Sequence, residues 1–432
     1  MDLRYESDSI TTSGVPKTLR RGPFVIVGSP DSIFVRQLAT EWRRRGADVV
    51  VVKLRGDDGA LPDGTPVLSG EREAGGLNVS RRLAGRCLHE VWRFHSRLRH
   101  RRYSGADEGE LPSFVDPLIL GPLAARRAQR LHPAFVFGQE AFSHGVATAL
   151  CRGIPRILMP WGGDIMLYAE TSAISFSMVR WALRSVDLVC PTSVAGAEHV
   201  IRRFGVSEER VRSISWGVDR QLFRAGSAEQ RIATRCSLGL EPAQPLVMNV
   251  RRFLPVWGSE AVVEAFLLLA EELPQVSFAL LGGHGSEPYV RAARQRIAQT
   301  AFANRFVFFD GDLPLAECAR LMAASDVFVS LMGYADMRSA SVLQAACAGA
   351  VPVLAEHREY RELEKLGFRA QFVNPDRPAE VAGAIRLYLE NGELVKVTRA
   401  ANQRYIAQCE DFDTQMGRLL EAIGGTSDRV SR

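Results

Sequence analysis

The strongest constraint on the fold is an alternation of short apolar runs with helical stretches, which occurs in two separate series. The first series has its apolar runs at residues 24–28, 48–54, 134–138, 156–160 and 187–191. The second has them at residues 246–251, 277–283, 306–309, 327–331, 351–354 and 370–373. Apolar strands that are each followed by a helix are typical of a parallel sheet covered on both faces. The pattern therefore predicts the α/β class, with two doubly wound, Rossmann-like domains.

The length of the chain supports two domains, because 432 residues exceed one ordinary hydrophobic core. We expect a loose tail at 1–20, a first domain at 21–215 and a linker at 216–245, where Gly, Pro and polar residues concentrate. A second domain is expected at 246–400, and residues 401–432 as a helix that crosses back to the first domain, followed by a tail. Ligands of such sheets bind beyond the carboxyl ends of the strands. Two facing domains therefore predict a site in a central cleft.

Charge and cysteine usage narrow the class of protein. The net charge of +5 is mildly basic, which fits phosphorylated ligands or an anionic membrane surface and is too small to indicate nucleic-acid binding. The 7 cysteines are scattered without a C-x-x-C pair, which argues against a disulfide framework or a zinc site. The polar residues 1–20 do not resemble a signal peptide, and no apolar run is long enough to span a membrane. These features predict a cytoplasmic protein.

Residues 81–102 form a basic stretch with helical periodicity, in which eight arginines stand against the single acid Glu90. One interpretation is a helix that packs on its apolar stripe and exposes a solvated basic face. The other is a docking face for anionic lipid or for a lipid-phosphate acceptor, which would hold the protein peripherally at the inner membrane face.

The segment 336–354, "DMRSASVLQAACAGAVPVL", reads as a loop, a helix, a Gly stop and a strand. Free N–H groups and the positive dipole end at the start of such a helix form an anion site. The segment resembles the "E-x7-E…LLEAMACGLPVV" region of retaining family 4 glycosyltransferases, which have the GT-B fold. Asp336 stands at the first acid of that pattern and Gln344 at the second. The resemblance extends over roughly residues 22–425 and implies a GT-B fold with two Rossmann-like domains.

The resemblance implies roles for the residues of this segment. Asp336 would contact the transferred sugar as a catalytic residue, and Gln344 would bind the ribose hydroxyls of a nucleotide. The backbone N–H groups of the helix start would bind the donor diphosphate; they belong to Ser339, Ala340, Ser341 and Val342.

Further binding residues follow from "NVRRFLPVWG" and "LLGGHGSE" in the second half. The first resembles the family's "VGRLxxxKG", so that Arg252 takes the place of the phosphate-binding Arg and Trp257 that of the Lys. Arg251, or stacking on Trp257, would partly replace that Lys. In the second motif Gly283 would admit the nucleotide base, and His284 would line the site without binding a metal.

Two loops of the first half complete the predicted site. Gly28 and Ser29 follow a strand, and their loop is either a structural turn or, as in the family, a cover for the donor pyrophosphate. Trp161 stands where family members often have His, followed by Gly163 and Asp164. Asp164 is either a catalytic-site residue that accepts a hydrogen bond from a hydroxyl of the sugar or acceptor, or a helix cap.

The resemblance implies a retaining glycosyltransferase, of the hexosyltransferase type, that uses a nucleotide-diphosphate sugar as donor. No cofactor or metal is expected, and the acceptor would be a saccharide, a lipid-linked saccharide or a small metabolite. The alternative is a catalytically inactive GT-B-like protein that binds a nucleotide sugar or assists an active transferase. Trp161, Trp257 and Gln344 motivate this alternative, because each replaces a charged or titratable family residue with a neutral one.

Overall fold

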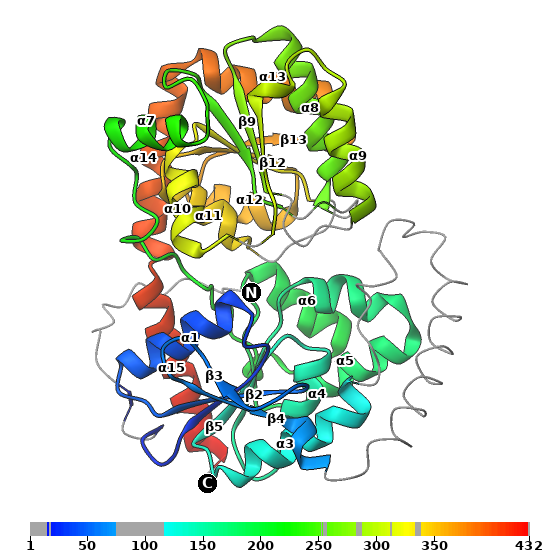
Figure 1. Cartoon of the computed structure of the whole chain (residues 1–432). Coiled ribbons are helices and arrows are strands. Elements are labelled where there is room, and N and C mark those ends of the chain that lie inside the picture. Colours follow the sequence, from blue (N-terminus) through cyan, green and yellow to red (C-terminus); the bar gives the residue numbers. More distant parts are fainter. Residues whose placement is uncertain are drawn as a thin grey trace. The chain divides into compact units, whose positions relative to one another are not determined.

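A computed structural model describes residues 15–16, 19–74, 116–251, 253, 257–281, 287–311, 313–332 and 338–430 (Figure 1). The described residues form two compact units. The first contains the chain up to Ser215 together with the end of the chain from Thr414, and the second contains Trp216–Asp413. Residues 216–245, predicted as a linker, belong to the second unit and contain a helix.

The first unit is built on a seven-stranded sheet with the strand order β3-β4-β2-β1-β5-β6-β7. All neighbours are parallel except β3, which runs antiparallel to β4. The strands are β1 (Phe24–Val27), β2 (Val49–Lys53), β3 (Gly59–Ala60), β4 (Pro66–Ser69), β5 (Phe135–Gln139), β6 (Arg156–Met159) and β7 (Leu188–Val189). The α-helices are α1 (Ile33–Arg44), α3 (Gly121–Arg130), α4 (Ser143–Leu150), α5 (Ala173–Ser185), α6 (Val194–Phe204) and α15 (Phe412–Val430).

Both faces of this sheet bury apolar side chains, as the sequence pattern requires. One face packs against α3 and α4 in a cluster that includes Val25, Val136 and Ala147. The alternate strand positions face the other side of the sheet. There the ring of Trp42 from α1 contacts the rings of Phe24 and Phe135 edge-on, with ring centres 5.4 Å apart in each pair. Alternate residues of one strand therefore enter different cores, which explains the near-continuous apolar runs.

The second unit is built on a fully parallel six-stranded sheet with the order β10-β9-β8-β11-β12-β13. Its strands are β8 (Leu246–Asn249), β9 (Ser277–Leu281), β10 (Phe306–Phe309), β11 (Val327–Ser330), β12 (Val351–Ala355) and β13 (Gln371–Val373). Its α-helices are α7 (Ala228–Ser237), α8 (Ser259–Glu272), α9 (Glu287–Ala298), α10 (Leu315–Ala324), α11 (Ala340–Cys347), α12 (Arg358–Lys365), α13 (Pro378–Glu390) and α14 (Gly392–Cys409). Helices α8, α9 and α13 cover one face, and α10, α11 and α14 the other (Figure 1).

Every strand predicted from an apolar run is present, and the predicted α/β class with two parallel-sheet domains is confirmed. The sequence pattern missed β3 and β4, which extend the first sheet at its edge. Their two and four residues lie in a stretch rich in Gly, Pro and Asp, where no apolar run signals a strand. The basic stretch at 81–102 lies outside the described residues.

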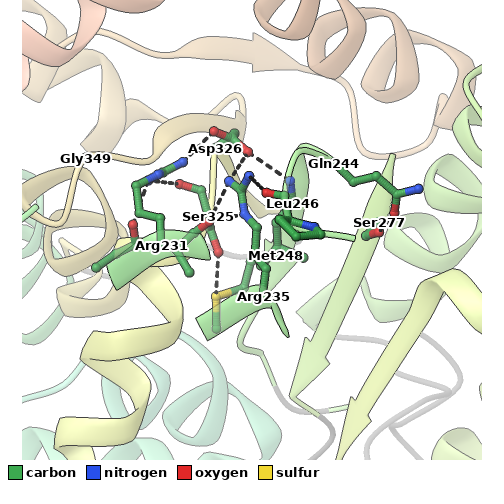
Figure 2. A network of polar contacts seen from close by, with 12 residues as sticks. Arg231, Arg235, Gln244, Leu246, Met248, Ser277, Ser325, Asp326 and Gly349 are labelled. Atoms are coloured by element: carbon green, nitrogen blue, oxygen red, sulfur yellow. Dashed lines mark hydrogen bonds and ion pairs between the residues drawn. The ribbon is translucent and has the colours of Figure 1, made fainter. Parts of the chain in front are cut away.

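Figure 2 shows how helix α7 is fixed to the second sheet at the amino-terminal ends of its strands. The carboxylate of Asp326, just before β11, accepts hydrogen bonds from Arg231 at 2.5 Å and from Arg235 at 2.7 Å. It also accepts the backbone N–H of Leu246 at 2.9 Å. These contacts satisfy the half-buried carboxylate of Asp326. The network lies at the amino-terminal ends of the strands and stabilises the fold, whereas ligands of such sheets bind at the carboxyl ends.

Candidate functional site

At the carboxyl edge of the second sheet, the side chain of Arg251 joins two neighbouring strands to the start of α11. Arg251 follows β8, and its Nε lies 3.4 Å from the hydroxyl of Ser330 at the end of β11. One terminal nitrogen of its guanidinium donates to the hydroxyl of Ser339, and the group lies 5.0 Å from the ring centre of Trp257. Arg251 therefore brings a permanent positive charge to the helix start.

The start of α11 has the geometry of an anion site. Ser339 is the N-cap residue and has extended backbone angles. Its side chain does not cap the helix. The Ser339 hydroxyl instead contacts Arg251 and lies 3.2 Å from the hydroxyl of Ser341. Ala340 and Ser341 are half-buried in the first turn, and Val342 is buried. Unbonded backbone N–H groups of a first helical turn and a neighbouring guanidinium both attract a phosphate.

Of the other residues predicted for this site, the structure describes Gln344 but not four others. Gln344 lies half-buried on α11, one turn beyond its start. Asp336, Arg252, Gly283 and His284 lie outside the described residues, so the roles predicted for them stay predictions. Among the described residues, Arg251 lies against Ser339. The sequence predicted for Arg251 only that it would partly replace the family's Lys, and its contact with Ser339 could not be derived from "NVRRF".

Arg338, directly before Ser339, forms a buried ion pair. Its side chain is 1% exposed and donates to the fully buried carboxylate of Glu410 at 2.7 Å, to which the hydroxyl of Tyr405 also donates at 2.7 Å. Its backbone has φ 28, a left-handed conformation that is unfavourable for a residue with a side chain. The ion pair thus fixes a strained backbone next to the helix start.

In the first unit, the loop after β1 is tightly packed. A Cβ on Gly28 would lie 2.8 Å from Val35 of α1, so a larger residue does not fit there. Ser29 is half-buried, and its carbonyl accepts the N–H of Ser32, which is the N-cap of α1. These contacts account for Gly28 as a structural turn, and the predicted pyrophosphate role of Gly28 and Ser29 stays a prediction.

Asp164 is 3% exposed and has both carboxylate oxygens in use. Oδ2 accepts the backbone N–H of Ala141 at 2.6 Å, and Oδ1 accepts those of Trp161, Gly162 and Ile165 at 2.9, 2.9 and 3.0 Å. Burial, and next the Glu140 carboxylate, raise the pKa of Asp164 to about 7, against the effect of the backbone donors. These contacts tie the loop after β5 to the loop after β6. The N-cap of the turn is Gly162, without a side-chain cap, so Asp164 is not the helix cap that was the alternative prediction, and its contact with a hydroxyl of the sugar or acceptor stays a prediction. Gly163 begins the π-helical turn that contains Asp164.

A Glu–His pair beside Asp164 was missed by the sequence analysis. Glu140 directly follows β5 and has φ 78, again a left-handed backbone. Its Oε1 accepts the N–H of His144 at 2.6 Å and lies 3.2 Å from His144 Nδ1, while Oε2 accepts the N–H of Phe142 at 3.0 Å. The position of a Glu and a His at the end of a predicted strand could have identified the pair, since such sheets bind ligands there.

A separate cavity of about 240 Å³ lies at the β2–β4 side of the first unit. Its lining carries charges of both signs, including Arg36, Lys53, Asp57 and Asp58. It contains none of the predicted site residues, and its mixed charge favours no one ligand class. Within the described part of the chain, no group of three or more His, Cys, Asp or Glu side chains could hold a metal ion, and no helix is long and apolar enough to cross a membrane.

The chain matches two family models. Residues 32–222 match the model described as Glycosyltransferase Family 4, and residues 230–405 match the one described as Glycosyl transferases group 1. An uncharacterized glycosyltransferase from Methanocaldococcus jannaschii is 22% identical over 216 residues, which is 50% of this chain and 52% of that protein. The match thus spans about half the length of this curated relative.

Solved structures resemble nearly the whole chain. Anabaena Alr3699/HepE in complex with UDP and glucose has a TM-score of 0.70 at 19% identity, with 94% of this chain and 100% of that chain covered. Sucrose-phosphate synthase from Thermosynechococcus elongatus has a TM-score of 0.69 at 15% identity, with 93% and 98% covered. The fold of these neighbours and the two consecutive family matches agree with the two sheets described above. The chain therefore belongs to the GT-B glycosyltransferases, with a family 4 first half and a group 1 second half.

Proposed function

We propose that the chain is a retaining glycosyltransferase that transfers a hexose from a nucleotide-diphosphate sugar to a hydroxyl-bearing acceptor. The observation that carries the proposal is the Arg251 guanidinium held against Ser339 at the start of α11. When a nucleoside diphosphate departs, negative charge develops on its phosphate oxygens, and a fixed guanidinium with oriented N–H groups stabilises that charge. The carboxyl edge of the second sheet supplies both.

Several further features support the donor class. The solved neighbour Anabaena Alr3699/HepE contains UDP and glucose in one structure and UDP-glucose in another, which makes UDP-glucose the first donor to test. Trp257 lies beside Arg251 and offers an aromatic face in place of the family's Lys. In this proposal Asp336 contacts the transferred sugar and Gln344 the ribose, while Arg252 and Gly283 contribute to the diphosphate and base sites. No metal ion is required, because Arg251 and the helix start provide the positive charge.

The second candidate function is binding of a nucleotide sugar without transfer. The neutral residues Trp161, Trp257 and Gln344 favour it, since each stands where the family has a charged or titratable side chain.

One experiment separates the two functions. The full chain is incubated with UDP-glucose and other nucleotide sugars, in the presence of EDTA, and free nucleoside diphosphate is measured together with the melting temperature. Slow release of diphosphate supports a transferase that uses water as a poor acceptor. A raised melting temperature without release supports the binding protein, and neither effect with any donor contradicts both. The anomeric configuration of the released sugar, read by proton NMR, tests retention.

A further inference from the structure

Glu410 lies close to the point at which the chain returns from the second unit to the first, and its side chain binds the residue before the start of α11. Within the described residues the chain passes between the units twice, at Ser215–Trp216 and at Asp413–Thr414. Glu410 is the C-cap of α14, just before the second passage, and its side chain is fully buried. Its Oε1 accepts a hydrogen bond from Arg338 at 2.7 Å. A residue near the passage thus contacts the direct neighbour of Ser339.

The two passages are joined inside the second unit by backbone contacts around Glu410. The N–H of Val218 donates to the Glu410 carbonyl at 2.6 Å, and the N–H of Phe412 donates to the Val218 carbonyl at 3.1 Å. Gly217 packs against the same backbone: its φ is 73, and a Cβ there would lie 2.7 Å from the Cα of Phe412. The Glu410 backbone is therefore held on both sides, and its carboxylate is a fixed partner for Arg338.

Arg338 needs a fixed partner because its backbone is strained. Its φ of 28 lies in the left-handed region, which residues with a Cβ rarely adopt. The side chains of the pair are 1% and 0% exposed, so separating them would leave two buried charges unpaired. Without the pair, Arg338 would relax to a negative φ. That rotation would change the direction of the peptide group that joins Arg338 to Ser339.

This peptide group carries the N–H of Ser339, one of the predicted donors to the diphosphate. Ser339 is the N-cap of α11, and its hydroxyl contacts Arg251. An anion site at a helix start depends on several N–H groups that point at the same place. Turning one of them away therefore weakens phosphate binding. The hydroxyl of Tyr405, a residue that is 2% exposed, donates to Glu410 Oε1 at 2.7 Å and helps to hold the carboxylate in place.

We propose that Glu410 is a positioning residue for the diphosphate of the donor, and that it acts through Arg338 on the N–H of Ser339. The identity of the ligand rests on the proposed function; Glu410 is buried and does not itself touch the ligand. The conformation with a left-handed Arg338 presents the complete set of N–H groups, so the apparent affinity falls with the population of that conformation. Because the Glu410 backbone joins the two passages, a displacement there should change the affinity at α11.

Titration of UDP and of inorganic pyrophosphate into the full chain, followed by calorimetry, tests the proposal at a temperature at which circular dichroism shows each variant folded. We expect Glu410→Gln to weaken the binding of both ligands about tenfold, because the relaxed backbone then competes with the binding conformation. Tyr405→Phe removes one hydrogen bond to the carboxylate and should weaken binding less, about threefold. Asp326→Asn is the control for lost stability. It removes a carboxylate from the arginine network at the opposite ends of the strands (Figure 2) and should leave both affinities unchanged.

A second pair of variants tests the connection to the passages. Gly217→Ala places a Cβ against Phe412, which must move together with the neighbouring backbone of Glu410. We expect the affinity for UDP to fall about threefold. Gly239→Ala is the matched control, since Gly239 has φ 72 and nothing within 4 Å of the added Cβ. It should bind UDP like the original chain.

Unchanged binding by Glu410→Gln, an equal loss in Asp326→Asn, or equal losses in Gly217→Ala and Gly239→Ala would overturn the proposal. If Glu410→Gln does not fold, unchanged binding by Tyr405→Phe overturns it instead. If the original chain binds UDP and these variants bind it equally well, the positioning role is wrong and the proposed function stands. If pyrophosphate binding depends on Glu410 while no nucleotide or nucleotide sugar binds, the proposed function is wrong and the positioning role stands.

Discussion

Arg251 is the residue on which the proposed donor site most depends. It follows β8 and contacts Ser330 at the end of β11, Ser339 at the start of α11, and Trp257. We expect Arg251→Ala to weaken UDP binding at least tenfold, because a charge-assisted contact to phosphate contributes about 1.5–3 kcal/mol. Isothermal titration calorimetry measures the change. Arg386→Ala, which removes an arginine that is 42% exposed on α13, is the control and should leave the affinity unchanged.

Arg338 and Glu410 form the most deeply buried ion pair among the described residues, with side chains 1% and 0% exposed. Glu410→Gln would leave the guanidinium without its charged partner, and we expect it to lower the free energy of unfolding by about 3–5 kcal/mol. Glu272→Gln breaks a surface pair to Arg386 and should cost less than about 1 kcal/mol. Urea unfolding followed by circular dichroism compares the two. Similar losses in both variants would show that burial does not set the strength of the first pair.

Asp164 makes the stability of the first unit depend on pH. Its pKa is raised from an ordinary 3.8 to about 7, so the folded chain binds this proton more tightly than the unfolded chain does. The resulting stabilisation is fully present below about pH 4 and is lost as the pH rises through about 7. The Asp164→Asn variant cannot ionise at this position. The free energy of unfolding of the original chain should therefore fall relative to that of the variant as the pH rises across this window. Urea unfolding at several pH values measures it, and a difference that does not change with pH would contradict the assignment.

At the scale of elements, Gly258 sets how closely α8 can approach β11. It is the N-cap of α8 with φ 66, and a Cβ there would lie 2.0 Å from the carbonyl oxygen of Leu331. Gly239 has nearly the same backbone, φ 72, but nothing within 4 Å of the added Cβ. We expect Gly239→Ala to cost only the left-handed strain of about 1–2 kcal/mol. Gly258→Ala should cost clearly more, because β11 or α8 must also move; equal unfolding midpoints for the two variants would exclude this steric explanation.

The sequence predicts elements better than it predicts contacts between them. Strands such as β8 and β12 were predictable because a strand buried on both faces must be apolar at successive positions. Strands β3 and β4 were not, because β4 is a strand through its pairing with β2, and β3 through its pairing with β4, rather than through apolar runs of their own. The contact of Arg251 with Ser339 spans 88 residues, and the direction of one side chain after β8 decides it. The Glu140–His144 pair is local and was available to sequence reasoning, whereas the contact of Asp164 with Ala141, 23 residues away, requires the three-dimensional structure.

At the scale of the whole molecule, the two units carry different kinds of polar groups at the carboxyl edges of their sheets. The described edge of the second unit has a guanidinium and a helix start, which suit an anion. The described edge of the first unit instead has two carboxylates, those of Asp164 and Glu140, which accept backbone N–H groups of the surrounding loops. The guanidinium and helix start support the proposal that the donor diphosphate binds to the second unit.

If the donor binds at the start of α11, UDP alone should stabilise the second unit and leave the first unchanged. At about a hundred times its Kd, a ligand that binds only the folded state stabilises it by about 2.7 kcal/mol. Amides of β8 and α11 that exchange through unfolding of the second unit should then exchange about a hundredfold more slowly, while those of β1 and β5 keep their rates. Hydrogen exchange with mass spectrometry resolves these segments. Equal slowing in both sheets would mean that both units bind the nucleotide. Slowing confined to β1 and β5 would mean that only the first unit binds it. In either case Arg251 could not be the residue that carries the donor site.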